Sequence, residues 1–367
     1  MASPQFKRLV VCTDGTWNDL TKGHPTNVIK IARAVKRVDA NGVPQVVYYH
    51  QGVGTGTDAV DRLLGGSTGW GISHNLRDAY NFLVMNYTPG DELYLFGFSR
   101  GAYTARSLAG LIRNVGILRP ERAHLVGKAY DHYRDRTDAT HPTAPESLHF
   151  VKANSHPDVR IHFVGVWDTV GALGVPLGFA RYGLKIWGAF TGNPLRYEFH
   201  DMELSSHVNH AYHAVSKHEQ REAFRPTLWN VPTGRSAEQT FAQKWFAGVH
   251  CNVGGGYEAA GLSDCALVWM AEYARKLGLE MDLEILDPPI MPDDKQPPEK
   301  NQTLMYRALA VLKKLNAHTV GVGFSPAEIE DLRSNVDWLG DYHRKGQDQS
   351  VGELLGADAA QGPRTAA

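Results

Sequence analysis

The pentapeptide Gly97-Phe98-Ser99-Arg100-Gly101 places a serine at the centre of a G-x-S-x-G pattern. An apolar run, ELYLF, directly precedes the pattern, and a helical pattern, AYTARSLAGLI, directly follows it. A serine on a tight turn between a strand and a helix exposes its hydroxyl as a nucleophile, and the flanking glycines let the two elements pass closely. We therefore expect Ser99 to attack a carbonyl carbon. The alternative is a helix-capping serine in a glycine-rich turn that cradles a phosphate.

Two polar residues that follow apolar runs would complete a catalytic set. A serine nucleophile needs a base within hydrogen-bond reach and an acid that orients the base. Asp168 follows the run RIHFVGVW and His250 follows KWFAGV, in the chain order Ser, Asp, His that hydrolases with this turn use. Because the carboxyl ends of parallel strands meet at one edge of a sheet, we expect Asp168 to orient His250 there. A turn or helix-cap aspartate and a buried structural histidine are the alternatives.

Backbone N–H groups close to the serine are candidates for holding an oxyanion. Arg100 begins the helix after the serine, and a second donor normally comes from a loop after an early strand. The first apolar run ends in Thr13-Asp14-Gly15-Thr16, so Gly15 and Thr16 are our candidates for that donor. Asp14 has two open interpretations, a supporting role in the site and an Asx turn that bonds its own loop.

Two acidic residues outside this set have structural interpretations. Asp264 is the second candidate for the acid, but it follows His250 in the chain and is better placed to cap the helix after it. Glu219 stands two residues before Arg221, and we expect these two side chains to form a local ion pair rather than to take part in chemistry.

Three histidines recur at every third position, at His207, His210 and His213. On a helix this spacing brings side chains to neighbouring faces, so a metal site is one interpretation. A partly exposed helix beside the cleft is the interpretation that we favour. We expect the reaction to need no metal and no other cofactor.

The elements that must position these groups alternate along the chain. Apolar runs of strand length occur at 7–13, 45–50, 92–96, 160–167 and 244–249. Helical patterns occur at 26–38, 74–87, 100–115 and 262–277. Such alternation is typical of βαβ units and of a mainly parallel sheet. We therefore predict an α/β fold of the α/β-hydrolase type, a mainly parallel sheet flanked by helices.

We predict one domain over residues 1–346, followed by a loose tail at 347–367 whose residues are small, polar and aperiodic. An aromatic insertion at about 174–205 lies between the candidate acid and base, which suits a cap over an acyl pocket. The candidate pocket residues in this insertion are Phe179, Trp187 and Phe190. The alternative is that the aromatic segment belongs to the ordinary core.

Composition limits the partners that the chain is expected to bind and the cell compartment in which it is expected to lie. The chain has 38 Lys and Arg against 39 Asp and Glu, so it has no long-range field that would gather nucleic acid, and charge gives no support for a membrane surface. The 3 cysteines form neither a disulfide framework nor a CxxC pair. Neither a signal-peptide pattern nor an apolar run of about 18 residues is present. We predict a cytoplasmic protein, with export by a leaderless route left open; the oligomeric state is not predicted.

The motifs DGTWN, HQGVGTG, GFSRGAYTARSLAGLI, VGVWDTVGALG, REAFRPTLW and WFAGVHCNVGGGY occur in this order between Lys7 and Met270. Together they resemble the family of α/β-hydrolase domains that includes the catalytic domain of type VI secretion phospholipase effectors. The resemblance implies a catalytic triad at Ser99, Asp168 and His250, and it implies lipid or other ester substrates.

The chemistry that follows from these residues is acyl transfer in two steps. Ser99 would attack a carboxylic ester while His250 takes its proton, and water would then release the acyl group from the serine. The predicted substrate is a small-molecule or lipid ester. Two alternatives remain open, a phospholipase that acts at a membrane surface and a non-catalytic binding module that retains the hydrolase fold.

Overall fold

The computed structural model describes residues 6–15, 23–52, 69–135, 137–171, 204–219, 221, 224, 226–230 and 239–299. In these ranges six strands form a sheet in the order β2-β1-β3-β4-β5-β6. All neighbouring strands in it are parallel. The predicted α/β-hydrolase-type architecture, a parallel sheet flanked by helices, is confirmed.

The described elements follow one another in a largely alternating order. The strands are β1 (Arg8–Thr13), β2 (Gln45–His50), β3 (Glu92–Phe98), β4 (Ile161–Trp167), β5 (Val208–Ser216) and β6 (Thr240–Phe246). The α-helices are α1 (Asn27–Ala34), α2 (Gly69–Asn86), α3 (Arg100–Val115), α4 (Val126–Arg134), α5 (Pro145–Asn154), α7 (His250–Gly254) and α8 (Gly261–Lys276).

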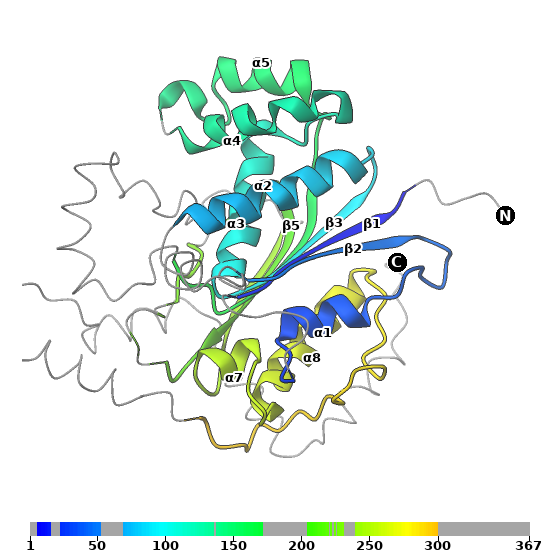
Figure 1. Ribbon diagram of the computed structural model, residues 1–367, viewed down its shortest axis with the longest axis vertical. Coiled ribbons are helices and arrows are strands. Elements are labelled where there is room, and N and C mark those ends of the chain that lie inside the picture. The colour runs from blue at the N-terminus through cyan, green and yellow to red at the C-terminus, as the bar shows by residue number, and fades with distance from the viewer. Residues whose placement is uncertain are drawn as a thin grey trace, which may run out of the picture.

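Helices cover both faces of the sheet (Figure 1). α1, α7 and α8 lie below the sheet in this view, and α2 and α3 lie above it with α4 and α5 stacked further out. Side chains alternate along β1, so Leu9 and Val11 enter the core beneath α2 and α3, whereas Val10 and Cys12 enter the core against α1 and α8. This two-sided burial explains why β1 is an almost continuous apolar run.

The strand order brings the loops of the candidate site together. The chain passes from β1 to β2 on one side and later to β3 on the other side of β1. The loops that leave the neighbouring strands β1 and β3 therefore run in opposite directions, and binding sites of α/β sheets lie at such a point. Thr13 is in register with Gly97, and Phe98 is in register with Trp167. The loop after β1, the turn after β3 and the residue after β4 therefore lie side by side at the carboxyl edge of the sheet.

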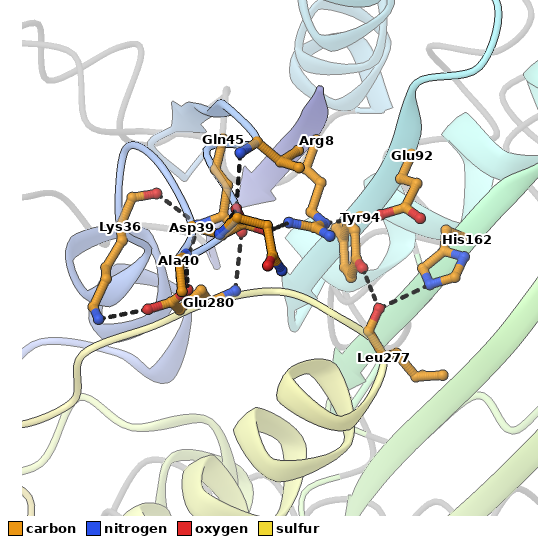
Figure 2. Close-up of polar contacts among 12 residues, drawn as sticks. Arg8, Lys36, Asp39, Ala40, Gln45, Glu92, Tyr94, His162, Leu277 and Glu280 are labelled. Atoms are coloured by element: carbon orange, nitrogen blue, oxygen red, sulfur yellow. Dashed lines mark hydrogen bonds and ion pairs between the residues drawn. The ribbon is translucent and has the colours of Figure 1, made fainter. Parts of the chain in front are cut away.

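The opposite edge of the sheet is held by buried polar contacts (Figure 2). Arg8 at the start of β1 donates to Asp39 at 2.6 Å and to Glu92 at 2.8 Å. Tyr94 Oη on β3 donates to the carbonyl of Leu277, just beyond α8, at 2.6 Å. These contacts join β1, β3, the loop before β2 and the segment after α8. They stabilise the end of the sheet that is opposite to the candidate site.

The predicted helix containing the spaced histidines is wrong, because His210 and His213 lie on β5. Side chains of a strand alternate between faces, so these two rings point to opposite sides of the sheet. His210 packs against His162, and His213 packs against Trp229. Among the residues that the structure describes, no three His, Cys, Asp or Glu side chains are grouped so as to hold a metal ion.

Other boundaries differ from the predicted ones or fall outside the described ranges. The strand predicted at 244–249 is β6, which ends at Phe246 and is followed by a short turn before α7. Most of the predicted cap insertion, with Phe179, Trp187 and Phe190, lies outside the described residues, as does the C-terminal tail. The division into one domain and a tail stays a prediction. Within the described part of the chain, no helix is both long and apolar enough to cross a bilayer.

Candidate active site

Ser99 occupies the turn between β3 and α3 in a backbone conformation that is rare for a residue with a side chain. Its φ is 58° and its ψ is −121°. Such a conformation costs on the order of 1–3 kcal/mol and persists only where the surroundings hold it. The Ser99 N–H donates to the Trp167 carbonyl at 3.1 Å, and the Ser99 carbonyl accepts from Tyr103 N–H at 3.2 Å. The strand, turn and helix predicted from the G-x-S-x-G pattern are present.

The two glycines of the pattern are required by close backbone contacts. A Cβ atom at Gly97 would lie 2.5 Å from the Gly101 carbonyl oxygen, and one at Gly101 would lie 2.1 Å from the Thr13 carbonyl oxygen. Thr13 Oγ1 also donates to the Gly101 carbonyl at 2.8 Å. The end of β1 therefore packs directly on the serine turn, and only a residue without a side chain fits at either position.

Asp168 directly follows β4, also with a positive φ, of 39°, and it is fully buried. Its Oδ1 accepts from Ser216 N–H at 2.8 Å, and its Oδ2 accepts from Ser216 Oγ at 2.9 Å. Oδ2 also lies 2.6 Å from His250 Nδ1. In the tautomer that carries its proton on Nδ1, the ring donates to this carboxylate and Nε2 is left as an acceptor.

His250 is the first residue of α7, and its ring lies between two aromatic side chains. The centroid of Phe98 is 4.6 Å from that of His250, and the centroid of Phe224 is 4.8 Å from it. Phe98 immediately precedes Ser99, so the same packing contact places the imidazole next to the serine turn. The structure thus brings Asp168 and His250 into direct contact and places Ser99 on the neighbouring strand end.

The loop after β1 is organised by the Asp14 carboxylate. Asp14 Oδ1 accepts from Gly15 N–H at 2.6 Å, and Oδ2 accepts from Thr26 Oγ1 at 2.7 Å and from Tyr49 Oη at 2.9 Å. Asp14 therefore bonds its own loop, the N-cap of α1 and β2. The Gly15 N–H, a candidate oxyanion donor, is engaged by Asp14, and the other candidate, Thr16, lies outside the described residues.

Arg100 supplies the remaining candidate donor. It is the first residue of α3, where backbone N–H groups have no acceptor inside the helix and carry the positive end of the helix dipole. Burial lowers the pKa of the Arg100 guanidinium to about 10, so the side chain is still charged at neutral pH. The N-terminus of α3, with the Arg100 backbone N–H, therefore directly follows Ser99.

Comparison with known proteins settles the family. A family model described as the catalytic domain of Tle1-like phospholipase effectors of the type VI secretion system matches residues 7–273. The chain belongs to this family.

The individual proteins that the chain is similar to share little sequence identity with it. An uncharacterised protein of Saccharomyces cerevisiae is 29% identical over 269 residues, which are 68% of this chain and 36% of that protein. The Tle1 effector solved in complex with the VgrG spike is 14% identical, with a TM-score of 0.46 over 90% of this chain and 83% of that one. An uncharacterised protein from Pseudomonas aeruginosa is 17% identical, with a TM-score of 0.44 over 89% of this chain and 52% of that one. The Tle1-like chain thus spans about a third of the curated relative that it matches.

Asp264, the second candidate for the acid, is engaged by groups other than His250. Its Oδ1 is 2.5 Å from Lys30 Nζ, and its Oδ2 accepts from Met291 N–H at 2.8 Å. Both side chains of the ion pair are buried, and they join α8 to α1. The predicted capping role is wrong, because α8 begins at Gly261 and Asp264 lies inside the helix.

Two side-chain contacts of the site were not predicted from the sequence. Ser216 donates to Asp168, and Glu219 accepts from the backbone N–H of His250 at 3.2 Å. The predicted ion pair between Glu219 and Arg221 is confirmed, at 2.8 Å. Ser216 ends β5 and Glu219 follows it. A strand predicted at this place would have put both residues at the carboxyl end of the sheet, but the spacing of the histidines favoured a helix instead.

His213 is a further contact of the Asp168 loop that was not predicted. The ring is fully buried, its Nε2 accepts from Thr169 N–H at 3.2 Å, and its Nδ1 lies 3.1 Å from Gln243 Oε1. Burial, together with the charge of Arg106, lowers the pKa of His213 to about 3. The ring is therefore neutral at physiological pH, and it holds the backbone of the residue after Asp168.

Proposed function

We propose that this Tle1-like domain is a serine hydrolase that cleaves carboxylic ester bonds, with Ser99 as nucleophile, His250 as general base and Asp168 as the acid. The observation that carries the proposal is the 2.6 Å contact between Asp168 Oδ2 and His250 Nδ1, beside the strained turn of Ser99. In a catalytic triad this contact holds the imidazole in the tautomer that accepts the serine proton and stabilises the imidazolium that forms.

In the first step the Ser99 Oγ–carbonyl bond forms while His250 Nε2 takes the hydroxyl proton. This step requires the Ser99 hydroxyl to come within hydrogen-bond reach of His250 Nε2 when substrate is bound, because catalytic hydrogen bonds often tighten only in the complex. The ester bond then breaks, and the departing alcohol takes the proton from His250. In the second step water, deprotonated by the same ring, attacks the acyl-serine. The bond between the acyl carbon and Ser99 Oγ breaks, Ser99 Oγ takes the proton from His250, and the acid is released.

The negative charge on the carbonyl oxygen in each step is held by backbone N–H groups. Arg100 N–H, at the start of α3, is the first donor, and each such donor contributes about 3 kcal/mol to the stabilisation of the transition state. The second donor comes from the loop of Gly15 and Thr16. The Gly15 N–H serves only after it leaves Asp14 Oδ1, to which it now donates.

Family membership favours a lipid ester as the substrate class, and a phospholipase that acts at a membrane surface is the second candidate. The two candidates differ in their response to aggregated substrate. Purified protein should be assayed with p-nitrophenyl esters of graded acyl length, with monomeric short-chain phosphatidylcholine and with phosphatidylcholine vesicles. Activity that appears only on vesicles supports the surface enzyme, and activity on soluble esters supports the general esterase.

Loss of all ester hydrolysis in Ser99→Ala, with the wild-type protein active, is the result that the proposal predicts. A folded wild-type protein that cleaves none of these substrates would favour the binding module.

Burial raises the pKa of the Cys251 thiol to about 11, so this neighbour of His250 stays protonated at neutral pH and is a poor alternative nucleophile.

A further inference from the structure

We infer that Glu219, Arg221 and Phe224 form a clamp that positions the His250 imidazole without touching the substrate. The inference rests on the proposed function, because it assigns positioning residues to the same site. We call these three side chains the His250 clamp. A purely structural role, as an ion pair that only stabilises the fold, is the interpretation that the experiment must separate from it.

The first contact of the clamp is with the backbone of His250. Glu219 Oε2 accepts from His250 N–H at 3.2 Å, across 31 residues of sequence. His250 begins α7, so its N–H has no acceptor within the helix, and the N-cap residue Val249 has no side-chain oxygen to offer. Glu219 supplies the missing acceptor from the loop after β5, and this bond fixes the peptide from which the imidazole projects.

Arg221 in turn fixes the Glu219 carboxylate in one orientation. Glu219 Oε1 accepts from Arg221 N–H at 2.8 Å and from Arg221 Nε at 2.9 Å, and Oε2 accepts from Nη2 at 2.8 Å. A bidentate contact between a planar guanidinium and a carboxylate allows little rotation of either group. The Glu219 side chain is only 2% exposed, so the pair is shielded from competing water.

The clamp acts by position rather than by charge. Burial alone would raise the pKa of Glu219, but hydrogen bonds from the side chain and backbone of Arg221 hold the pKa below its ordinary value. The carboxylate is therefore ionised, and the adjacent guanidinium balances its charge. The pair adds no net charge beside His250.

The third contact closes the clamp on the imidazole itself. Arg221 Cζ lies 3.7 Å from the ring centroid of Phe224, and the Phe224 ring meets the His250 ring at 62° with centroids 4.8 Å apart. Phe98 packs on the ring with a centroid distance of 4.6 Å. The chain of contacts that begins at the His250 backbone thus returns to the His250 side chain. Because a misplacement of about 1 Å can lower a rate about 100-fold, loss of the clamp should be visible in turnover.

The test compares Glu219→Ala and Glu219→Gln with wild type, using a soluble acyl ester. Glu219→Gln keeps an oxygen that can accept from His250 N–H, so it serves as the conservative variant. We expect kcat to fall about 100-fold in Glu219→Ala, with KM changed less than about threefold, and to recover partly in Glu219→Gln. The matched control is Glu272→Ala, which removes an exposed ion pair with Lys276 and should leave kcat and KM unchanged.

Two further readouts separate positioning from stability. Titration of active sites with a fluorophosphonate gives the fraction of folded, reactive protein, to which kcat is normalised. The proton on His250 Nδ1, in the short contact with Asp168, should give a downfield NMR resonance in wild type and in Glu272→Ala, and this resonance should broaden or disappear in Glu219→Ala.

Each result bears on one of the two proposals. If normalised kcat and the resonance are the same in Glu219→Ala as in wild type, the clamp is wrong and the pair only stabilises the fold. If the wild-type protein neither hydrolyses esters nor reacts with the fluorophosphonate, the proposed function is wrong. In that case the resonance alone decides the clamp, because it reports the orientation of His250 without any substrate.

Discussion

Asp168 Oδ2 and His250 Nδ1 lie 2.6 Å apart although 82 residues separate them in the chain. Their strands are not neighbours in the sheet, because β5 lies between β4 and β6. The same β5 ends in Ser216, whose N–H and hydroxyl both donate to the Asp168 carboxylate. The intervening strand therefore orients the acid, while the turn after β6 brings the base across to it.

Asp168→Asn should lower kcat for ester hydrolysis by about 10⁴-fold while leaving the protein folded. An amide at this position still accepts from Ser216, but it also offers an N–H group to His250, which favours the wrong tautomer of the ring. Steady-state kinetics on a soluble ester, with circular dichroism to follow the fold, measures both effects. A variant that keeps more than a tenth of wild-type kcat would remove Asp168 from the triad.

Asp264→Asn should have the opposite profile, with lower stability and normal turnover per folded molecule. The substitution leaves Lys30 buried without its opposite charge, and breaking a buried ion pair in this way costs about 3–5 kcal/mol. Urea unfolding measures the change. Replacing both partners, as in Lys30→Met with Asp264→Leu, should restore most of the stability. If Asp264→Asn abolishes turnover in folded protein while Asp168→Asn does not, the acid has been assigned to the wrong residue.

Gly101→Ala should destabilise the domain by more than about 3 kcal/mol, because the new methyl group would overlap the backbone of Thr13. The matched control is Gly127→Ala in α4, where a Cβ atom meets nothing within 4 Å. That substitution should stabilise the helix by about 0.5–1 kcal/mol. Thermal unfolding of both variants is the measurement, and equal effects would show that the contact at the serine turn is unimportant.

The buried ring of His213 should make the wild-type protein less stable in mild acid. Its pKa is about 3 in the folded state against an ordinary value of 6.5, so the unfolded chain binds a proton below pH 6.5 that the folded chain excludes. The free energy of unfolding should therefore fall as the pH is lowered from 7 to 5, by on the order of 1–2 kcal/mol from this residue.

His213→Gln cannot take up that proton, and its unfolding free energy should fall less than that of wild type over the same pH interval. Chemical denaturation of both proteins at several pH values measures the difference. The other histidines are present in both proteins, so their contribution to the pH dependence cancels. Identical pH profiles for the two proteins would mean that His213 takes up a proton in the folded state as readily as in the unfolded chain.

The site residues were predictable wherever local sequence determines local structure. The place of Ser99 on a turn between a strand and a helix could be predicted from the residues around it, and the glycines of the turn are demanded by contacts at 2.5 Å and below. The proximity of Asp168 and His250 could be predicted because both follow apolar runs, and parallel strands bring such ends together.

The errors and omissions concern contacts that local sequence does not encode. His207, His210 and His213 recur at every third position, but His210 and His213 lie on opposite faces of a strand, β5, that is paired on both sides. Periodicity cannot distinguish a buried central strand from a helix. Glu219 was expected to bond Arg221, which is a short-range contact, whereas its bond to His250 depends on how the loop after β5 meets α7.

Reaction with a fluorophosphonate tests the central claim most directly. Intact mass spectrometry and peptide mapping should find one adduct, on Ser99, which is absent in Ser99→Ala and forms far more slowly in Asp168→Asn. The Ser99→Ala protein should unfold within about 1 kcal/mol of wild type, so that loss of labelling is not loss of fold. A folded wild-type protein that acquires no adduct, or acquires it on a different residue, would contradict the account.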